Sequence, residues 1–313
     1  MPENVLDLAF VAGLLTLVFR LATPLLLASV ANLVPALAGV VDMSPEGTMT
    51  LGAFFGFLVV QRTGSLWLGI VAGGLAGLVC SLLSALMIVV LKIRHSVAGI
   101  GQNLLAAGLT FYFFRTIYGS AGGEIPHVPV FDRVYIPGLS DLPIVGVLFN
   151  QHALTYLAYA VVALLWLVIY KTKYGLILRT TGEEPRAVDT KGISVGLVQL
   201  IALVVAGVLY GIAGAFLPLV STGIFVTGIV AGRGWIAVTL VVFGRFKPVP
   251  IAIGALFFGF LTALQLQIQA LGVRFPYEIL LALPFLATVV ALVVRGRESQ
   301  DAPAHLGLTY QRE

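Results

Sequence analysis

Residues 66–91 read LWLGIVAGGLAGLVCSLLSALMIVVL and contain no charged side chain. A helix needs about 20 apolar residues to cross the hydrocarbon core of a bilayer, and this stretch is long enough. The whole chain has the same character, because 59% of its residues are hydrophobic and only 10% are charged. Soluble domains carry about 25% charged residues. The sequence therefore predicts an all-α, polytopic transmembrane helical bundle that forms one domain over residues 1–313.

Apolar stretches like this one recur along the chain, and they predict about ten helices. Two of them, 47–60 and 232–244, are too short for a straight span, which is typical of broken helices beside a transport pathway. Their sequences GTMTLGAFFG and GWIAVTLVVFG are similar, through an internal repeat or by chance. The ten predicted segments are 5–19, 20–38, 47–60, 66–91, 97–118, 152–170, 194–217, 232–244, 250–272 and 276–294.

Glycines at regular spacing mark one face of the segment 66–91. Gly69, Gly73 and Gly77 lie four residues apart. Small residues on one helix face let two helix backbones approach closely. We expect this face to pack within the subunit rather than against a second subunit.

Lysine and arginine residues predict the orientation of the chain. If both termini lie on one side of the membrane, 12 of the 18 Lys and Arg residues fall on that side. Positive residues accumulate in cytoplasmic loops, so the prediction is N-in and C-in. The net charge of +4 is small and lies in loops, which indicates topology rather than nucleic-acid binding. In this arrangement, 119–151 is an external loop of irregular, proline-rich structure.

The polar stretch KTKYGLILRTTGEEPRAVDTKGISV, residues 171–195, separates two long apolar segments. Pro185 suits the first position of a helix, and Gly192 suits the position that ends one. The pattern predicts a short cytoplasmic helix over 185–191, roughly 10 Å long. A helix of this length is not stable alone in water, so it needs a partner surface or support from its own loop.

Motifs for nucleotide and metal chemistry are missing from the sequence. There is no G-x-x-x-x-G-K-[ST] loop for ATP and no H-E-x-x-H zinc motif. Cys80 is the only cysteine, and the four histidines lie far apart in the sequence. We therefore expect no P-loop nucleotide site, no metal site and no cofactor bound by this chain.

Two carboxylates four residues apart are the strongest candidates for chemistry. Asp42 and Glu46 could together bind Mg²⁺ in a membrane-embedded enzyme. Pro45 and Gly47 favour a different interpretation, a junction between two helices with the acids near the start of the second helix. The sequence contains no second acidic cluster that would complete a two-metal site.

Four further residues are candidates for a transport pathway. Arg233 lies between glycines beside a short helix, where it can be an anchor or a gating element. For Asn103, hydrogen bonding between helices is favoured over substrate contact. Gln265 is expected to face the protein interior or a water-filled cavity. Phe225 lies between glycines at a bend, where its ring can stack on a planar base or simply pack in the core.

Five strings in consistent order resemble the permease subunits of ATP-binding cassette importers of the branched-chain amino acid and simple sugar class, and most closely the nucleoside-type permeases. The first covers the acidic pair and the last covers Arg233. They are AGVVDMSPEGTMTLGAFFG (38–56), VAGIGQNLLAAGLTFY (97–112), IPGLSDLPIVGVLFNQHALTYLAY (136–159), YGLILRTTGEEPRAVDTKGISV (174–195) and GRGWIAVTLVVFGRFKP (232–248).

The resemblance implies a half-transporter with a type II importer-like fold in the bacterial inner membrane, surrounded by lipid. Its expected partners are a cytoplasmic ATPase that binds ATP and Mg²⁺, a second permease that is related or identical, and an extracytoplasmic solute-binding protein. The segment 171–193 corresponds to the family's coupling segment. The residues expected to contact the ATPase are Glu183, Glu184, Pro185, Arg186, Ala187 and Asp189.

The sequence leaves three classes of substrate open, namely nucleosides, simple sugars and riboflavin-like compounds. Asp42 and Glu184 stand where the family usually has asparagine, and the first of these departures bears on the substrate because it can alter the polarity of the pathway. The pathway is expected to be mostly apolar, with a weak site lined by Asp42, Glu46, Asn103, Phe225, Arg233 and Gln265. The alternatives from other classes are a membrane enzyme that uses Asp42 and Glu46, and a stand-alone secondary transporter or channel.

Overall fold

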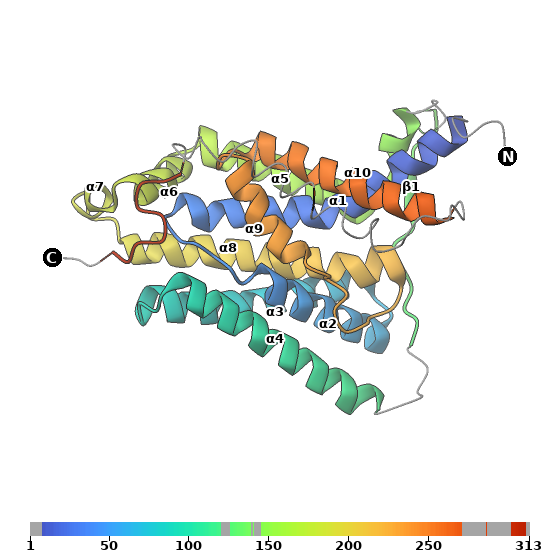
Figure 1. Ribbon diagram of the computed structural model, residues 1–313, viewed down its shortest axis with the longest axis horizontal. Helices are drawn as coiled ribbons and strands as arrows, with labels where there is room; N and C mark the ends of the chain where they lie inside the picture. The colour runs from blue at the N-terminus through green and yellow to red at the C-terminus, as the bar shows by residue number, and fades with distance from the viewer. Residues whose placement is uncertain are drawn as a thin grey trace.

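The computed structural model describes residues 8–119, 126–138, 140, 145–270, 286 and 302–310. Within them the chain folds into an elongated bundle of helices α1 to α10 (Figure 1). Among the residues that the structure describes, six helices are long and apolar enough to cross a membrane, namely α1, α3, α4, α5, α8 and α10. The predicted all-α membrane fold is confirmed. The predicted segment 276–294 lies outside the described residues except for Leu286.

Helix α1 corrects one of the predictions. The segments 5–19 and 20–38 were expected to be two helices, but α1 runs unbroken over Leu8–Leu37. Pro24 lies inside α1 and cannot donate a backbone hydrogen bond, a defect that transmembrane helices tolerate. Nearby, the hydroxyl of Thr23 donates to the carbonyl oxygen of Phe19. With no turn between the two segments, the half-buried Arg20 becomes part of a single long helix.

The start of α1 lies at the end of the bundle opposite to the C-terminal segment 302–310 (Figure 1), and the predicted N-in and C-in placement of the termini stays a prediction. The orientation of the bundle relative to the membrane stays a prediction.

The other helices follow the predicted segments closely. Helix α2 spans Pro45–Thr63, five residues longer than predicted over 47–60, whereas α9 is as short as expected. The π-helical turns Leu86–Val90 and Leu217–Thr222 extend α3 and α8. The remaining helices are α3 (Leu66–Ala85), α4 (His95–Tyr118), α5 (Ala153–Lys171), α8 (Val195–Phe216), α9 (Arg233–Phe243) and α10 (Pro248–Ala270).

The loop 119–151 contains more regular structure than the sequence predicted. Strand β1 (Arg133–Tyr135) pairs antiparallel with β2 (Asn150–His152), and a 3₁₀ turn covers Val145–Phe149. The backbone N–H of Val128 donates to the carbonyl oxygen of Gly223 at 2.9 Å, and Phe131 N–H donates to that of Leu219 at 3.0 Å. These bonds attach the loop to the π-helical end of α8.

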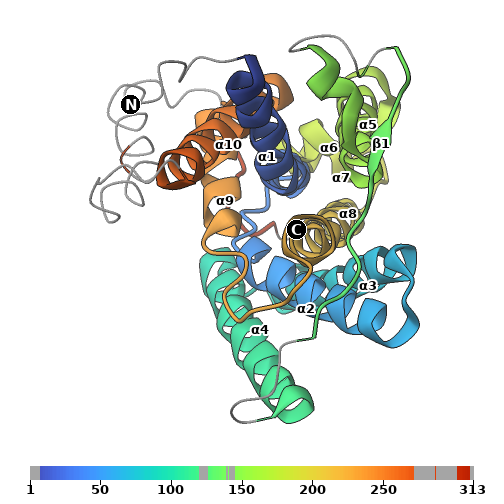
Figure 2. The ribbon, with the colours of Figure 1, turned by 90° about the vertical axis from the view of Figure 1, so that its right-hand side faces the viewer.

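Glycines bring α2, α3 and α8 into direct backbone contact. A Cβ atom on Gly77 of α3 would overlap the carbonyl oxygen of Gly207 in α8, and one on Gly52 of α2 would overlap that of Gly211. The glycine face of α3 therefore packs inside the subunit, as predicted. Figure 2 shows α8 near the middle of the bundle, with α4 at its rim.

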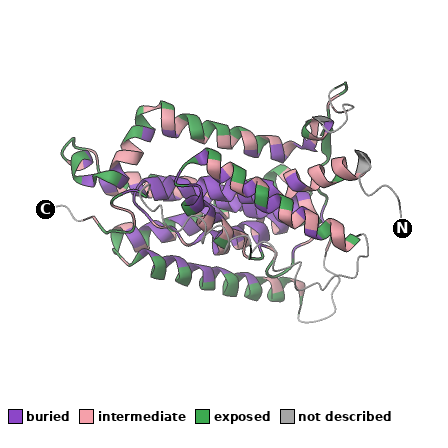
Figure 3. Cartoon of the chain, turned by 45° about the horizontal axis from the view of Figure 1, so that its top comes forward, coloured by how far each residue is buried: buried purple, intermediate pink, exposed green. Residues whose placement is uncertain are grey.

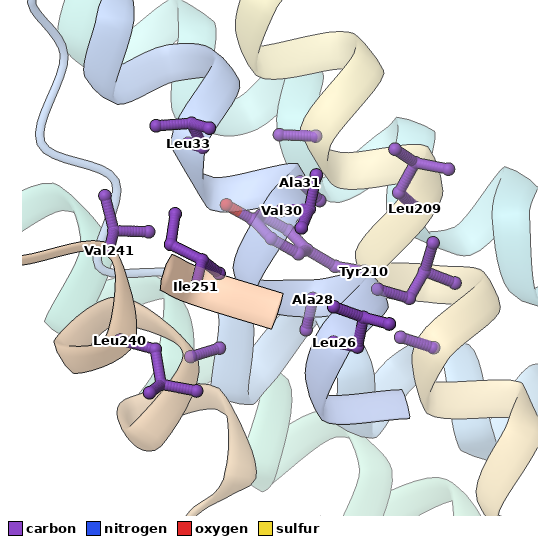
Figure 4. Packing of buried hydrophobic residues seen from close by; sticks show 14 of the residues in the cluster. Leu26, Ala28, Val30, Ala31, Leu33, Leu209, Tyr210, Leu240, Val241 and Ile251 are labelled. Carbon is purple, nitrogen blue, oxygen red and sulfur yellow. The ribbon is translucent and has the colours of Figure 1, made fainter. Parts of the chain in front are cut away.

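The largest apolar cluster lies between α1, α8, α9 and α10. Helices α1 and α8 each carry more buried residues than any of the other helices, whereas α4 is exposed along much of its length (Figure 3). Tyr210 of α8 lies fully buried among apolar side chains of α1 that include Val30 and Ala31 (Figure 4). Its hydroxyl is a polar group inside this core, and such groups require a hydrogen-bond partner.

Candidate functional site

The chain between α1 and α2 forms a non-helical crossing inside the bundle. We call residues 38–47 the junction segment. It begins with a turn at Gly39, whose φ of +83° is left-handed, and it ends in the first turn of α2. Val40, Asp42 and Ser44 are buried. Buried backbone outside a helix must find hydrogen-bond partners elsewhere, and several other helices supply them here.

Asp42 is held from the side of α1 and α8. The side-chain amide of Asn32 donates to the backbone carbonyl oxygen of Asp42 and to the hydroxyl oxygen of Tyr210, both at 2.9 Å. The Asp42 carboxylate accepts from the backbone N–H of Ser44 at 2.9 Å. Gln199 of α8 adds a bond to the carbonyl oxygen of Ala38 at 3.3 Å. Asp42 thus lies at the helix junction that the sequence favoured.

Helix α4 holds the opposite side of the junction segment through Asn103. Its amide nitrogen donates to the carbonyl oxygen of Met43 at 2.7 Å, and its amide oxygen accepts from Gly47 N–H at 2.8 Å. His95 Nδ1 accepts from Val41 N–H at 3.2 Å. The bonds of Asn103 join two helices, which was the favoured interpretation; contact with substrate stays a prediction.

Glu46 links the junction segment to the start of α9. One carboxylate oxygen accepts from Gly232 N–H and the other from Gly234 N–H, both at 2.8 Å. A carboxylate is favoured there because it meets unpaired N–H groups at the positive end of the helix dipole. A Cβ on Gly234 would overlap Glu46, so glycine is needed for this close approach.

Arg233 lies between the two glycines that bind Glu46. Its guanidinium donates to the carbonyl oxygens of Ile229 at 3.2 Å and Val230 at 2.9 Å. These bonds close the turn that leads into α9 and suit an anchor; a gating role is not tested. Within the described residues no group of three or more His, Cys, Asp or Glu side chains could hold a metal ion.

The structure thus gathers Asp42, Glu46, Asn103 and Arg233 around one segment, but it places Phe225 and Gln265 elsewhere. Phe225 is fully buried, with its ring centroid 5.4 Å from that of Phe54 and 5.5 Å from that of Phe114. Gln265 is buried on α10, beyond the point where Gly259 contacts Ala22 of α1. Whether either residue lines a pathway stays a prediction.

The polar stretch 171–193 forms two helices instead of one. Helix α6 covers Lys173–Glu183, which the sequence analysis did not assign, and α7 covers Pro185–Asp189. Helix α7 is shorter than the predicted 185–191 because its last turn continues as a hydrogen-bonded turn to Gly192, whose φ is +78°. Pro185 and Val188 are buried against the bundle.

The exposed side of α7 carries most of the residues predicted to contact an ATPase. Glu184, Arg186 and Ala187 are exposed at one end of the bundle, and Asp189 is partly buried (Figure 1). Glu183 is exposed at the end of α6, and one of its carboxylate oxygens accepts from the N–H of Ala304 at 3.2 Å. The bundle therefore ends in a small, rigidly anchored surface.

Comparison with known proteins decides the family. Residues 14–293 match the family described as branched-chain amino acid transport system, permease component. The chain belongs to this permease family. No solved structure matches it significantly.

Three curated relatives are permeases of ATP-binding cassette transporters. A protein named as a candidate glucose permease from Haloferax volcanii is 34% identical over 98% of this chain and 99% of its own. The guanosine permease NupQ of Bacillus subtilis is 33% identical over 94% of each chain. The nucleoside permease NupC of Lactococcus lactis is 33% identical over 87% of this chain and 89% of its own.

The chain is therefore the membrane-spanning permease subunit of an ATP-binding cassette transporter and a multi-pass protein of the inner membrane. ATP is hydrolysed on a separate subunit, and transporters of this kind work with an ATPase and a binding protein. The membrane enzyme built on Asp42 and Glu46 is not favoured.

Several residues of the junction were missed by sequence reasoning. Asn32, Gln199 and Tyr210 hold the junction segment directly or through one another. Each is a polar residue in a mostly apolar helix. Because unpaired polar groups are costly inside a membrane, every such residue is a candidate for an internal hydrogen bond.

Proposed function

We propose that this permease forms, with a second permease subunit, the pathway for a nucleoside or a simple sugar delivered by a solute-binding protein. Support comes from relatives over nearly the full chain that are named for glucose, guanosine and nucleosides. The second permease is a related chain or another copy of this one.

The observation that carries the coupling proposal is the construction of α7. Two apolar residues, Pro185 and Val188, anchor this short helix to the bundle, while Glu184, Arg186 and Ala187 face outward. A five-residue helix has little stability of its own, so its exposed side is well suited to fit a groove on a partner. In this proposal α7 docks on the ATPase, and Glu183, Glu184 and Arg186 make polar contacts there.

The proposed pathway passes the junction segment and has a weak site of its own. The polar side chains around it bond mainly to backbone groups, as Asn103 and Glu46 do. Few polar groups are then left to bind substrate tightly, and the binding protein supplies the affinity. The proposed lining residues are Asp42, Glu46, Asn103, Phe225, Arg233 and Gln265.

Uptake measurements test the substrate proposal. Proteoliposomes that contain the permease with its ATPase and binding protein should accumulate labelled guanosine or labelled glucose. This uptake should require ATP on the side of the membrane where the ATPase lies. Unlabelled nucleosides and sugars then compete to define the class. Uptake of neither compound, with ATP-driven uptake of a chemically different solute, would show that the substrate class is wrong.

Charge reversal at Arg186 tests the docking proposal. Arg186→Glu should lower ATP-driven uptake at least tenfold while membrane insertion stays normal. The reason is that a negative charge replaces the positive charge with which Arg186 contacts the ATPase in this proposal. Arg62→Glu is the matched control, since Arg62 is also exposed but lies at the far end of α2. Normal substrate-stimulated ATP hydrolysis and uptake in Arg186→Glu would exclude α7 as the docking element.

A further inference from the structure

The segment 302–310, near the C-terminus, lies against two parts of the molecule that are far apart in the sequence. The backbone N–H of His305 donates to the carbonyl oxygen of Gly182 in α6 at 2.8 Å. Two residues later, Gly307 N–H donates to the carbonyl oxygen of Gly39 at 2.9 Å. Gly307 has a φ of +79°, a left-handed turn that suits glycine. The segment thus bridges the end of α6 and the start of the junction segment.

Two carboxylates, one at the end of α6 and one at the end of α7, accept hydrogen bonds from the same segment. Glu183 accepts from Ala304 N–H at 3.2 Å, and Asp189 accepts from the hydroxyl of Tyr310 at 3.1 Å. The rings of His305 and Tyr310 meet edge to face, with centroids 6.4 Å apart. Hydrogen bonds to carboxylates are stronger than those between neutral groups, so these two contacts hold the segment to both ends of α7.

The segment is also fixed to the membrane helices. Pro303 is buried, and Leu306 packs against the core cluster that contains α1 and α8. Gly39 and Gly182 lie so close that a Cβ on Gly39 would be 3.5 Å from the Cα of Gly182 and 3.3 Å from the carbonyl oxygen of His305. Three segments therefore meet at the end of α1, three residues before Asp42.

We propose that residues 302–310 form a coupling strap that fixes α7 to the start of the junction segment, so that a displacement of α7 is carried to Asp42 and Glu46. The proposal rests on the proposed docking of α7 on an ATPase. Helix α7 is too short to hold its own position, and the strap supplies contacts at both of its ends. Tyr310 is a positioning residue in this arrangement, because it acts through Asp189 and not on the substrate.

The test uses the complete transporter in proteoliposomes and measures solute uptake per ATP hydrolysed. Tyr310→Phe keeps the ring beside His305 and removes the hydroxyl that donates to Asp189. It should lower uptake per ATP by about two- to tenfold, the factor that one hydrogen bond is worth. Deletion of residues 302–313 should lower it further. Tyr112→Phe is the matched control, because Tyr112 is exposed on α4 away from the strap and should leave uptake per ATP unchanged.

Two additional measurements separate the outcomes. Amide hydrogen exchange should show protection of His305 and Gly307 in the wild type, and thermal unfolding should be the same for Tyr310→Phe and wild type. If uptake per ATP is normal in both variants, or if Tyr310→Phe only lowers the unfolding temperature, the strap is structural and the inference is wrong. If the deletion variant fails to insert into the membrane, the test of the strap rests on Tyr310→Phe alone. A wild-type protein that neither binds an ATPase nor responds to ATP overturns the proposed function, and the strap with it.

Discussion

Glu46 shows how one side chain can organise a broken region of a membrane protein. Its two oxygens accept the N–H groups of Gly232 and Gly234, and its own backbone lies in the first turn of α2. One carboxylate therefore fixes the starts of two helices relative to each other. The sequence placed Glu46 correctly at the N-terminus of a helix, which is α2. It did not show that the carboxylate of Glu46 also binds the start of α9.

Removal of this carboxylate should destabilise the permease. Glu46→Ala leaves two N–H groups without their acceptor and should lower the free energy of unfolding by about 2–3 kcal/mol. Glu46→Gln keeps one acceptor and should have an intermediate effect. Thermal unfolding of the purified protein in detergent measures both.

The control for Glu46 is an acid with no such partner. The side chain of Glu184 precedes α7 without capping it. Glu184→Ala should change the stability by less than about 0.5 kcal/mol. Equal stabilities of Glu46→Ala and Glu184→Ala would mean that the carboxylate does not hold α9.

At the scale of helices, the glycine contacts between α3 and α8 control how closely the bundle packs. Gly77→Ala places a methyl group where the carbonyl oxygen of Gly207 lies, and we expect it to cost about 1–3 kcal/mol. Gly101→Ala on α4 is the matched control, because no atom lies within 4 Å of its added Cβ. It should be neutral or stabilising by up to about 1 kcal/mol. Detergent unfolding curves that rank the two variants in the reverse order would contradict this packing.

Helix boundaries could be predicted wherever hydrophobic length and turn residues agreed. The segment 97–118 became α4, and Gly192 ended the turn after α7, as expected. The prediction of two segments between residues 5 and 38 was wrong, because no glycine or asparagine separates them near Arg20 and the chain continues as one helix. Helix α6 was missed because its polarity resembles that of a loop, and only its contacts with α1, α5 and α8 make it a stable helix.

The partners around the junction segment could not be predicted for a related reason. Asn32 and Tyr210 are far apart in the sequence, and their mutual hydrogen bond depends on how α1 packs against α8. Composition identified the polar residues that need partners, but it did not pair them. The contacts of residues 302–310 with Gly39 and Gly182 left no signal in the sequence that distinguishes them from an ordinary tail.

For the whole molecule, the proposed orientation places α7 in the cytoplasm and the β1–β2 loop outside. A membrane-impermeant thiol reagent can test this on a Cys80→Ala background, since Cys80 is the only cysteine. Asp132→Cys is exposed beside β1 and should react in intact cells, whereas Thr190→Cys, just after α7, should react only after permeabilisation. Labelling in the reverse pattern would invert the orientation.

The central claim is that α7 is the surface through which an ATPase drives this permease, and a cross-link measures it directly. A photo-reactive amino acid at Ala187, which is exposed on α7, should form an adduct with the ATPase in the assembled transporter. The same amino acid at Leu104, exposed on the long apolar helix α4, should not. An ATPase adduct from position 187 alone is the predicted result. No adduct from position 187 in a transporter that hydrolyses ATP, or an equal yield from position 104, would contradict the claim.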